Sequence, residues 1–291
     1  MRTSLDCIPC FIRQALDASK MITSDEKFII RAMKRVLAAI SDFDLGLTPP
    51  EAGQVIHRII REEMKDPDPY LKLKELSTAR ALELSGRIKI TITGSKNPFE
   101  TAVRFSIAGN IMDFGMRSDW DEAHIMSSFE KAEREPIDLK SLECLYNEIK
   151  NAKTVLVLGD NAGETVFDRL LIEVFPGNAR VYYAVKGSAV INDATAEDAR
   201  QAGIENVAEI LSNGVDSSGT LLNKCSGEFL SIFNDADVVI SKGQGNFETL
   251  NNAERKIYFL LQVKCKVIAD FYNFRHGEWI VADSNSLNKT N

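Results

Sequence analysis

Short runs of β-branched and aromatic residues alternate with helix-like segments in the second half of the chain, and this alternation constrains the fold most. Strands are expected at 154–158, 180–185, about 207–211, 237–241 and 266–269, with a candidate edge strand at 278–282. Helix-like stretches cover about 164–174, 194–202, 217–234 and 246–262. Strands that alternate with helices of this length are typical of parallel βαβ units. The sequence therefore predicts an α/β fold with a doubly wound, Rossmann-like, mostly parallel sheet.

The first half of the chain carries helical patterns almost throughout. Capping residues and apolar spacing predict helices from Ser24 to Ile40, from Thr48 to Ile60, from Asp68 to a stop at Gly86, from Pro98 to Ala108, from Glu122 to Arg134 and from Leu139 to Asn151. No flexible linker separates this part from the rest. We therefore expect a helical domain at 1–151 packed on an α/β domain at 152–291.

Charge and composition exclude several classes of function. The 291 residues include 35 Lys+Arg and 42 Asp+Glu, so the formal charge is -7, which argues against non-specific nucleic-acid binding. The longest apolar runs fall far short of the roughly 20 residues that a membrane span needs. Five cysteines spread over this length do not make a disulfide framework. A cytoplasmic protein without membrane or nucleic-acid partners is the simplest expectation.

Acid and amide residues follow two of the predicted strands. Asp160 and Asn161 come just after the strand at 154–158, and Asn192 and Asp193 come one βαβ unit later. Ligands of open α/β sheets bind at the carboxyl ends of the strands. An all-oxygen set of Asp160, Asn161 and Asp193 suits Mg²⁺ or Mn²⁺ better than Zn²⁺. The alternative for the first pair is a turn followed by a helix cap, since Asx residues favour both positions.

Two neighbouring segments add a candidate base and a candidate anion site. Glu164 could hydrogen-bond the loop, bind the ion through water or act as a general base, while Asp168 is better explained as a solvated or structural acid. Lys242, Gly243, Gly245 and Asn246 form a glycine loop with one cation before a helix, which can bind phosphate or be an ordinary turn. No GxxxxGK[ST] motif is present, so nucleoside triphosphate binding is not expected.

Other polar motifs allow structural explanations. Cys7 and Cys10 form a CxxC without a second metal-binding half, which favours a structural or site-lining role. Asn110 and Asp113 follow a helix end, where a C-cap accounts for Asn110 without any function. No GxSxG motif or Cys/His pairing indicates covalent hydrolysis by Ser or Cys.

Six segments together resemble the damage-control phosphatases, long filed as domain of unknown function 89, in their small archaeal and bacterial branch with a CxxC. The segments are Asp6–Cys10, Ala108–Gly115, Gly159–Glu164, Ile191–Thr195, Ser241–Glu248 and Val263–Ala269. The resemblance implies a metal-dependent phosphatase of small phosphorylated metabolites, such as sugar phosphates or damaged phosphometabolites, that uses Mg²⁺, Mn²⁺, Co²⁺ or Ni²⁺. The arginine-threonine-lysine signature of some eukaryotic relatives is absent.

The resemblance also implies roles for individual residues. Asp160, Asn161 and Asp193 would hold the metal, and the loop from Lys242 to Asn246 together with Lys264 would face the phosphate. Asn110 and Asp113 would reach the site from the helical part.

The leading hypothesis is phosphomonoester hydrolysis, by water or through attack by Asp160 itself. A non-catalytic protein that binds a metal and a phosphometabolite is the alternative, and a methyltransferase ranks low because the first loop is acidic.

Overall fold

A single six-stranded sheet lies at the centre of the computed structural model, which describes residues 1–111, 127 and 129–287. Its strands run in the order β3-β2-β1-β4-β5-β6, and every neighbouring pair is parallel except β5 and β6, which are antiparallel. The bounds are β1 Thr154–Leu158, β2 Arg180–Val185, β3 Glu209–Ser212, β4 Val238–Lys242, β5 Tyr258–Gln262 and β6 Trp279–Asp283. This order confirms the predicted doubly wound, mostly parallel sheet.

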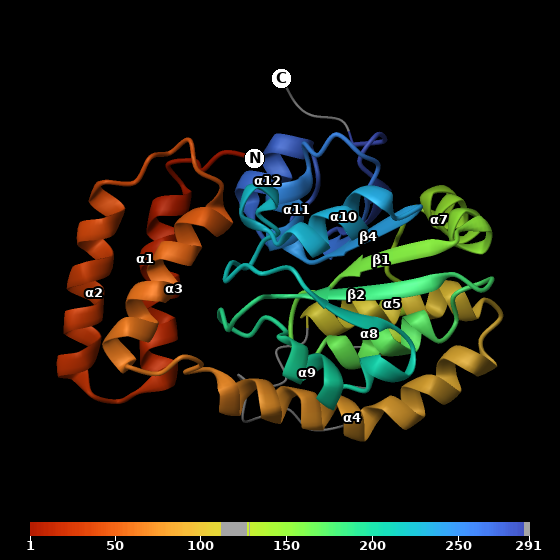
Figure 1. Ribbon diagram of the computed structural model, residues 1–291, viewed down its shortest axis with the longest axis horizontal. Helices are drawn as coiled ribbons and strands as arrows, with labels where there is room; N and C mark the ends of the chain where they lie inside the picture. Colours follow the sequence, from red (N-terminus) through yellow and green to blue (C-terminus); the bar gives the residue numbers. More distant parts are fainter. Residues whose placement is uncertain (112–126, 128, 288–291) are drawn as a thin grey trace.

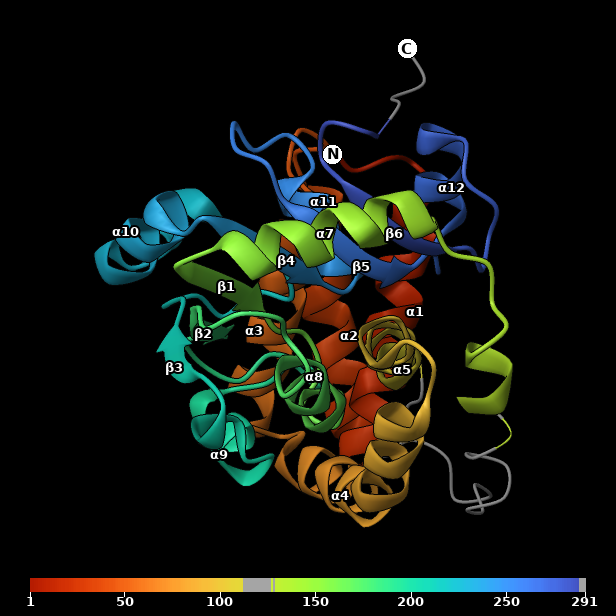
Figure 2. The same cartoon turned by 90° about the vertical axis from the view of Figure 1, so that its right-hand side faces the viewer.

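Helices cover both faces of the sheet (Figure 1, Figure 2). One face packs against α4 (Leu71–Gly94), α5 (Pro98–Ile111), α7 (Leu139–Asn151), α8 (Thr165–Ile172) and α9 (Ala196–Gln201). The other packs against α10 (Gly227–Asp235), α11 (Gln244–Leu250) and α12 (Lys266–Tyr272). Within β1, Val155 and Val157 point to the first face and Leu156 and Leu158 to the second, as alternate strand residues must.

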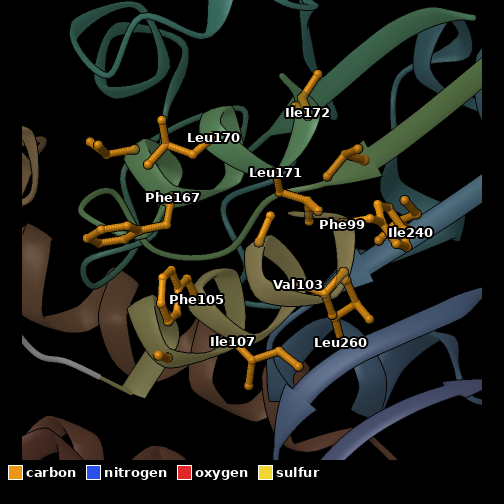
Figure 3. Close-up of a cluster of buried hydrophobic side chains, with 14 of the residues drawn as sticks. Phe99, Val103, Phe105, Ile107, Phe167, Leu170, Leu171, Ile172, Ile240 and Leu260 are labelled. Carbon is orange, nitrogen blue, oxygen red and sulfur yellow. The ribbon is translucent and has the colours of Figure 1, made fainter. Parts of the chain in front are cut away.

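The first face is held by a large apolar cluster that joins residues far apart in the sequence. Figure 3 shows Phe99 and Val103 of α5 beside Ile240 of β4 and Leu260 of β5. All four side chains are at most 4% exposed. The contacts therefore group α4, α5 and α7 with the sheet, although these helices precede residue 152.

Three N-terminal helices stand apart from the sheet and share their own core. They are α1 (Cys7–Ile22), α2 (Glu26–Ser41) and α3 (Pro49–Met64), and Figure 1 shows them side by side at one end of the molecule. Asp25 caps α2 by accepting a hydrogen bond from the Lys27 N–H, and Thr48 and Glu51 form a capping box on α3. Long α4 then carries the chain from this unit along the sheet domain.

One strand prediction is wrong. Residues 266–269 lie in α12, and the strand is β5 at Tyr258–Gln262, within the stretch expected to be helical. Both faces of β5 are buried, so its residues form a continuous apolar run without the alternation of a half-exposed strand. Such a run cannot be distinguished from a buried helix by periodicity alone.

Helix bounds also differ from the prediction: α11 ends at Leu250, and α1 at Cys7–Ile22 was not among the expected helices. Helix α4 passes through Gly86 and ends at Gly94, because a glycine in a helix supported by tertiary contacts is tolerated. Residues 217–226 are mostly irregular, with a 3-10 turn at Leu222–Lys224, and α10 begins only after its Ser226 cap. Of the helix expected at 122–134, residues 122–126 and 128 lie outside the described residues, and residues 129–132 are helical. No helix within the described residues has the length and apolarity to cross a membrane.

Candidate active site

The site forms where the strand order reverses, between β1 and β4. Leu158 at the end of β1 is paired with Ala184 of β2 and with Ser241 of β4. The residues that follow these three strands therefore emerge at one edge of the sheet. The segments that follow β1 and β4 lead to opposite faces of the sheet. Doubly wound proteins bind their ligands in the crevice that this leaves.

Backbone pairing between two loops brings the predicted metal ligands together. The Ala162 N–H donates to the Asn192 carbonyl at 2.9 Å, and the Ala194 N–H donates to the Asp160 carbonyl at 2.8 Å. Asn161 and Asp193 themselves form an isolated antiparallel bridge. The acid-amide pair after β1 and the acid after the next strand thus lie side by side, as their positions predicted.

Asn110 of α5 reaches this group from the other side. Its Nδ2 donates to Asp160 Oδ2 at 2.6 Å and to Glu164 Oε2 at 2.5 Å. Lys264 Nζ in turn donates to the Asn110 carbonyl at 2.7 Å and to its Oδ1 at 3.0 Å. Asn110 is therefore part of the site rather than only a helix cap. Asp113, expected to accompany it, lies outside the described residues.

Lys242 does not lie where a phosphate could reach it. Its ammonium is fully buried below the cavity, where it forms ion pairs with Glu164 and, at 2.5 Å, with Asp168. Burial alone lowers the pKa of Lys242, but these two carboxylates raise it overall. The expected place of Lys242 beside the phosphate is revised, because the buried acids of α8 attract its charge. Asp168 is the structural acid of the pair, held also by Ser106 and Tyr183.

Glu164 sits between the buried ion pairs and the cavity. Its Oε1 accepts from Lys242, and its Oε2 accepts from Asn110 and from the Asn161 N–H at 3.3 Å. Burial raises the pKa of Glu164 to about 7, against the opposing charge of Lys242. With most of its acceptor positions occupied, Glu164 is placed to hold Asn110 and the loop after β1.

A second buried lysine, Lys186, was not predicted. It follows β2 directly, is 2% exposed, and lies 3.5 Å from Asp193 Oδ2. Its Nζ donates to Asn246 Oδ1 at 3.2 Å, and Asn246 Nδ2 donates to the Gly159 carbonyl at 3.1 Å. Asn246 thus connects the three loops instead of facing solvent. The signal was available, since Lys186 follows a strand just as Asp160 does.

A cavity of about 780 Å³ lies between these loops and the N-terminal ends of α1 and α3. Of the predicted site residues, Asn110, Asp160, Asn161, Glu164, Asp193, Gly245 and Lys264 line it. Lys242, Gly243 and Asn246 lie behind this wall. Cys7 and Cys10 line the cavity from the first turn of α1, as the site-lining alternative for the CxxC proposed. Gln244 of the loop from Lys242 to Asn246 lines it as well, and so do Glu248 and Cys265, for which no role was predicted.

Comparisons with known proteins show the family of the chain. A family model described as the damage-control phosphatase ARMT1-like domain matches residues 3–280. The chain belongs to this damage-control phosphatase family. A damage-control phosphatase of Pyrococcus horikoshii is 34% identical over 92% of this chain and 93% of its own. One of Archaeoglobus fulgidus is 31% identical over 96% and 98%.

The fold of this damage-control phosphatase family member is also shared with a solved structure. A crystal structure of a DUF89 family protein from Pyrococcus horikoshii superposes with a TM-score of 0.90 at 32% identity, covering 98% of this chain and 99% of the other. An uncharacterized protein of Methanocaldococcus jannaschii is 35% identical over 91% of this chain and 90% of its own. The similarity thus extends over the whole fold and is not confined to one motif.

The residues after β1 and β2 fit a hard divalent ion. Asp193 Oδ2 is buried, and no hydrogen bond to it exists within the described residues. Burial raises the pKa of Asp193 well above its usual range despite Lys186, because Asp160 and Glu164 add negative charge. Gly243 has φ +77°, and any Cβ there would overlap Asp160 Oδ2, so the backbone leaves this carboxylate room. No cluster of three His, Cys, Asp or Glu suited to a metal occurs in the described part; the expected set has two carboxylates and one amide.

Proposed function

We propose that this chain is a divalent-metal-dependent phosphatase that hydrolyses the monoesters of small phosphorylated metabolites. The observation that carries the proposal is the gathering of Asp160, Asn161 and Asp193, with Glu164 behind them, at the wall of a cavity of metabolite size. Three carboxylates repel a phosphate dianion unless a cation lies between them. The membership in the damage-control phosphatase family supports the same chemistry.

Asp160, Asn161 and Asp193 would hold the ion, and their oxygen atoms favour Mg²⁺ or Mn²⁺, with Co²⁺ or Ni²⁺ as further candidates. Bound there, a divalent ion supplies positive charge to a phosphate oxygen and increases the acidity of water. Lys264 would bind the phosphate, since its ammonium lines the cavity and is held by Asn110. Lys186 and Lys242 fix the carboxylates of Asp193 and Glu164 from behind.

Phosphate release from p-nitrophenyl phosphate and from a panel of sugar phosphates tests the proposal, with each metal in turn and with a chelator. Asp160→Asn and Asp193→Asn should abolish metal-dependent release while circular dichroism stays unchanged. Asp235→Asn, the same change at an exposed helix end, serves as the control. Full activity in either site variant, or activity that a chelator does not affect, would reject the proposal.

Two further outcomes have defined meanings. Tight binding of a metal and a sugar phosphate in calorimetry without phosphate release would identify the alternative, a non-catalytic phosphometabolite-binding protein. Recovery of an aspartyl phosphate on Asp160 after acid quenching would show that this residue attacks phosphorus itself. Its absence under single-turnover conditions would favour direct attack by water.

A further inference from the structure

Glu248 is a buried acid of the cavity wall that the proposed function does not use. It is 7% exposed, and its Oε1 accepts a hydrogen bond from Gln244 Nε2 at 3.0 Å. The N-terminal amine of Met1 donates to the Glu248 main-chain carbonyl at 2.9 Å. No lysine or arginine of the described residues forms an ion pair with the Glu248 carboxylate. The side chain therefore faces the cavity with one neutral hydrogen-bond donor beside it.

The buried acids near the proposed metal ligands differ from Glu248, because each has a lysine beside it. Glu164 is paired with Lys242, and Asp193 lies beside Lys186. A buried carboxylate without such a cation favours its protonated form, because burial disfavours the charge. Burial accordingly raises the pKa of Glu248 to about 7, with Asp160 adding to the rise and Gln244 and the N-terminal amine opposing it. A carboxyl group that still holds its proton near neutral pH thus lines the cavity.

The position of Glu248 connects the two sides of the cavity. It lines the same cavity as Asp160 and Lys264 on the phosphate side and as Cys7 and Cys10 on the α1 side. A phosphate bound near Asp160 and Lys264 has its organic group in the remaining space toward α1. The ester oxygen that joins the phosphate to the organic group then lies beside the part of the cavity wall that contains Glu248.

We propose that Glu248 is a catalytic proton donor to the leaving-group oxygen of the phosphate monoester. This inference rests on the proposed function. Water forms the new P–O bond and its excess proton leaves to solvent. The P–O bond to the organic group breaks, and its electron pair goes to the ester oxygen. The Glu248 proton binds that oxygen to give an alcohol, and the carboxylate then regains a proton from solvent.

Substrates whose leaving groups differ in basicity test this step. An alkoxide such as that of glycerol 3-phosphate leaves poorly without a proton, whereas p-nitrophenolate is a stable anion. Glu248→Gln keeps the shape and can still accept from Gln244, but it cannot supply the proton. We expect it to lower kcat for glycerol 3-phosphate by roughly 100-fold and kcat for p-nitrophenyl phosphate by less than about threefold. Glu248→Asp, a shorter acid, should give an intermediate loss for the alkyl ester.

Matched controls separate this role from a structural one. Glu254→Gln makes the same chemical change at an exposed position and should leave both rates unchanged. An equal loss for both substrates in Glu248→Gln would show that Glu248 only shapes the cavity, and no loss for either would show that it is not used. Failure of the wild-type protein to release phosphate from any substrate with any metal would instead reject the proposed function itself.

Discussion

Replacing Lys242 decides between a phosphate-binding lysine and a lysine that neutralises buried acids. The side chains of Lys242 and Glu164 are each 0% exposed, and that of Asp168 is 1% exposed. Lys242→Met keeps most of the volume and removes the charge, so two carboxylates remain buried without their cation. Removing one partner of a buried ion pair costs about 3–5 kcal/mol. For a chain of this size, such a loss lowers Tm by roughly 6–10 °C.

Urea unfolding followed by circular dichroism measures this change, with enzyme kinetics on the same preparations. A second substitution should restore part of the stability, because Lys242→Met with Asp168→Asn leaves one fewer unpaired charge. The free-energy cost of the double variant should therefore be smaller than the sum of the two single costs.

Lys264→Met tests a lysine that is expected to bind the phosphate. Lys264 lines the cavity, and its ammonium donates a hydrogen bond to the Asn110 carbonyl. The substitution should raise KM for p-nitrophenyl phosphate and leave the unfolding free energy nearly unchanged. The reasoning would be refuted if Lys242→Met unfolded at the wild-type urea concentration and raised KM without changing kcat. That result would return Lys242 to the phosphate, where its sequence position first placed it.

Three further predictions follow from other parts of the structure. Gly243→Ala should abolish activity in a phosphate-release assay, because φ is +77° and the new methyl group overlaps Asp160 Oδ2; wild-type activity would contradict this. Arg61→Ala should lower the free energy of unfolding in urea more than Arg58→Ala does. Both arginines form an ion pair with Asp216, but the Arg61 side chain is 15% exposed and that of Arg58 is 52% exposed. Equal losses in the two variants would contradict this. Glu248→Gln should gain stability over wild type as pH rises from 4.5 through 7, by on the order of 3 kcal/mol at pH 8. The raised folded-state pKa of Glu248 makes the wild type lose stability over this pH window. An equal difference in unfolding free energy between variant and wild type at pH 5 and pH 8 would contradict this prediction.

The fold was largely predictable because short sequence patterns indicate most of its strands and helices. Strands β1, β2 and β4 each show a short β-branched run that ends in polar residues, and helices alternate with them. The missed strand, β5, is buried on both faces as β1 and β4 are, but its sequence Tyr-Phe-Leu-Leu-Gln contains no β-branched residue. Its apolar residues carry no period that separates strand from helix.

The site was predictable only where position along a strand determines position in space. Asp160, Asn161 and Asp193 follow neighbouring strands, so their meeting needed no knowledge of distant contacts. Lys242 also follows a strand, yet its partner Asp168 lies 74 residues away and on the inner side of a helix. Whether a lysine at a strand end faces solvent or buried acids depends on that packing, which no short motif encodes.

The two glutamates of the cavity show how partners, rather than residue type or pKa alone, separate chemical roles. Burial raises the pKa of both Glu164 and Glu248 to about 7. Glu164 accepts hydrogen bonds from a lysine, an asparagine and a backbone N–H, all of which favour its charged form. Glu248 accepts from one neutral amide and lacks a lysine or arginine partner among the described residues. One site can therefore hold a fixed anion beside the metal side and a removable proton on the leaving-group side, which is the separation that acid catalysis of ester cleavage requires.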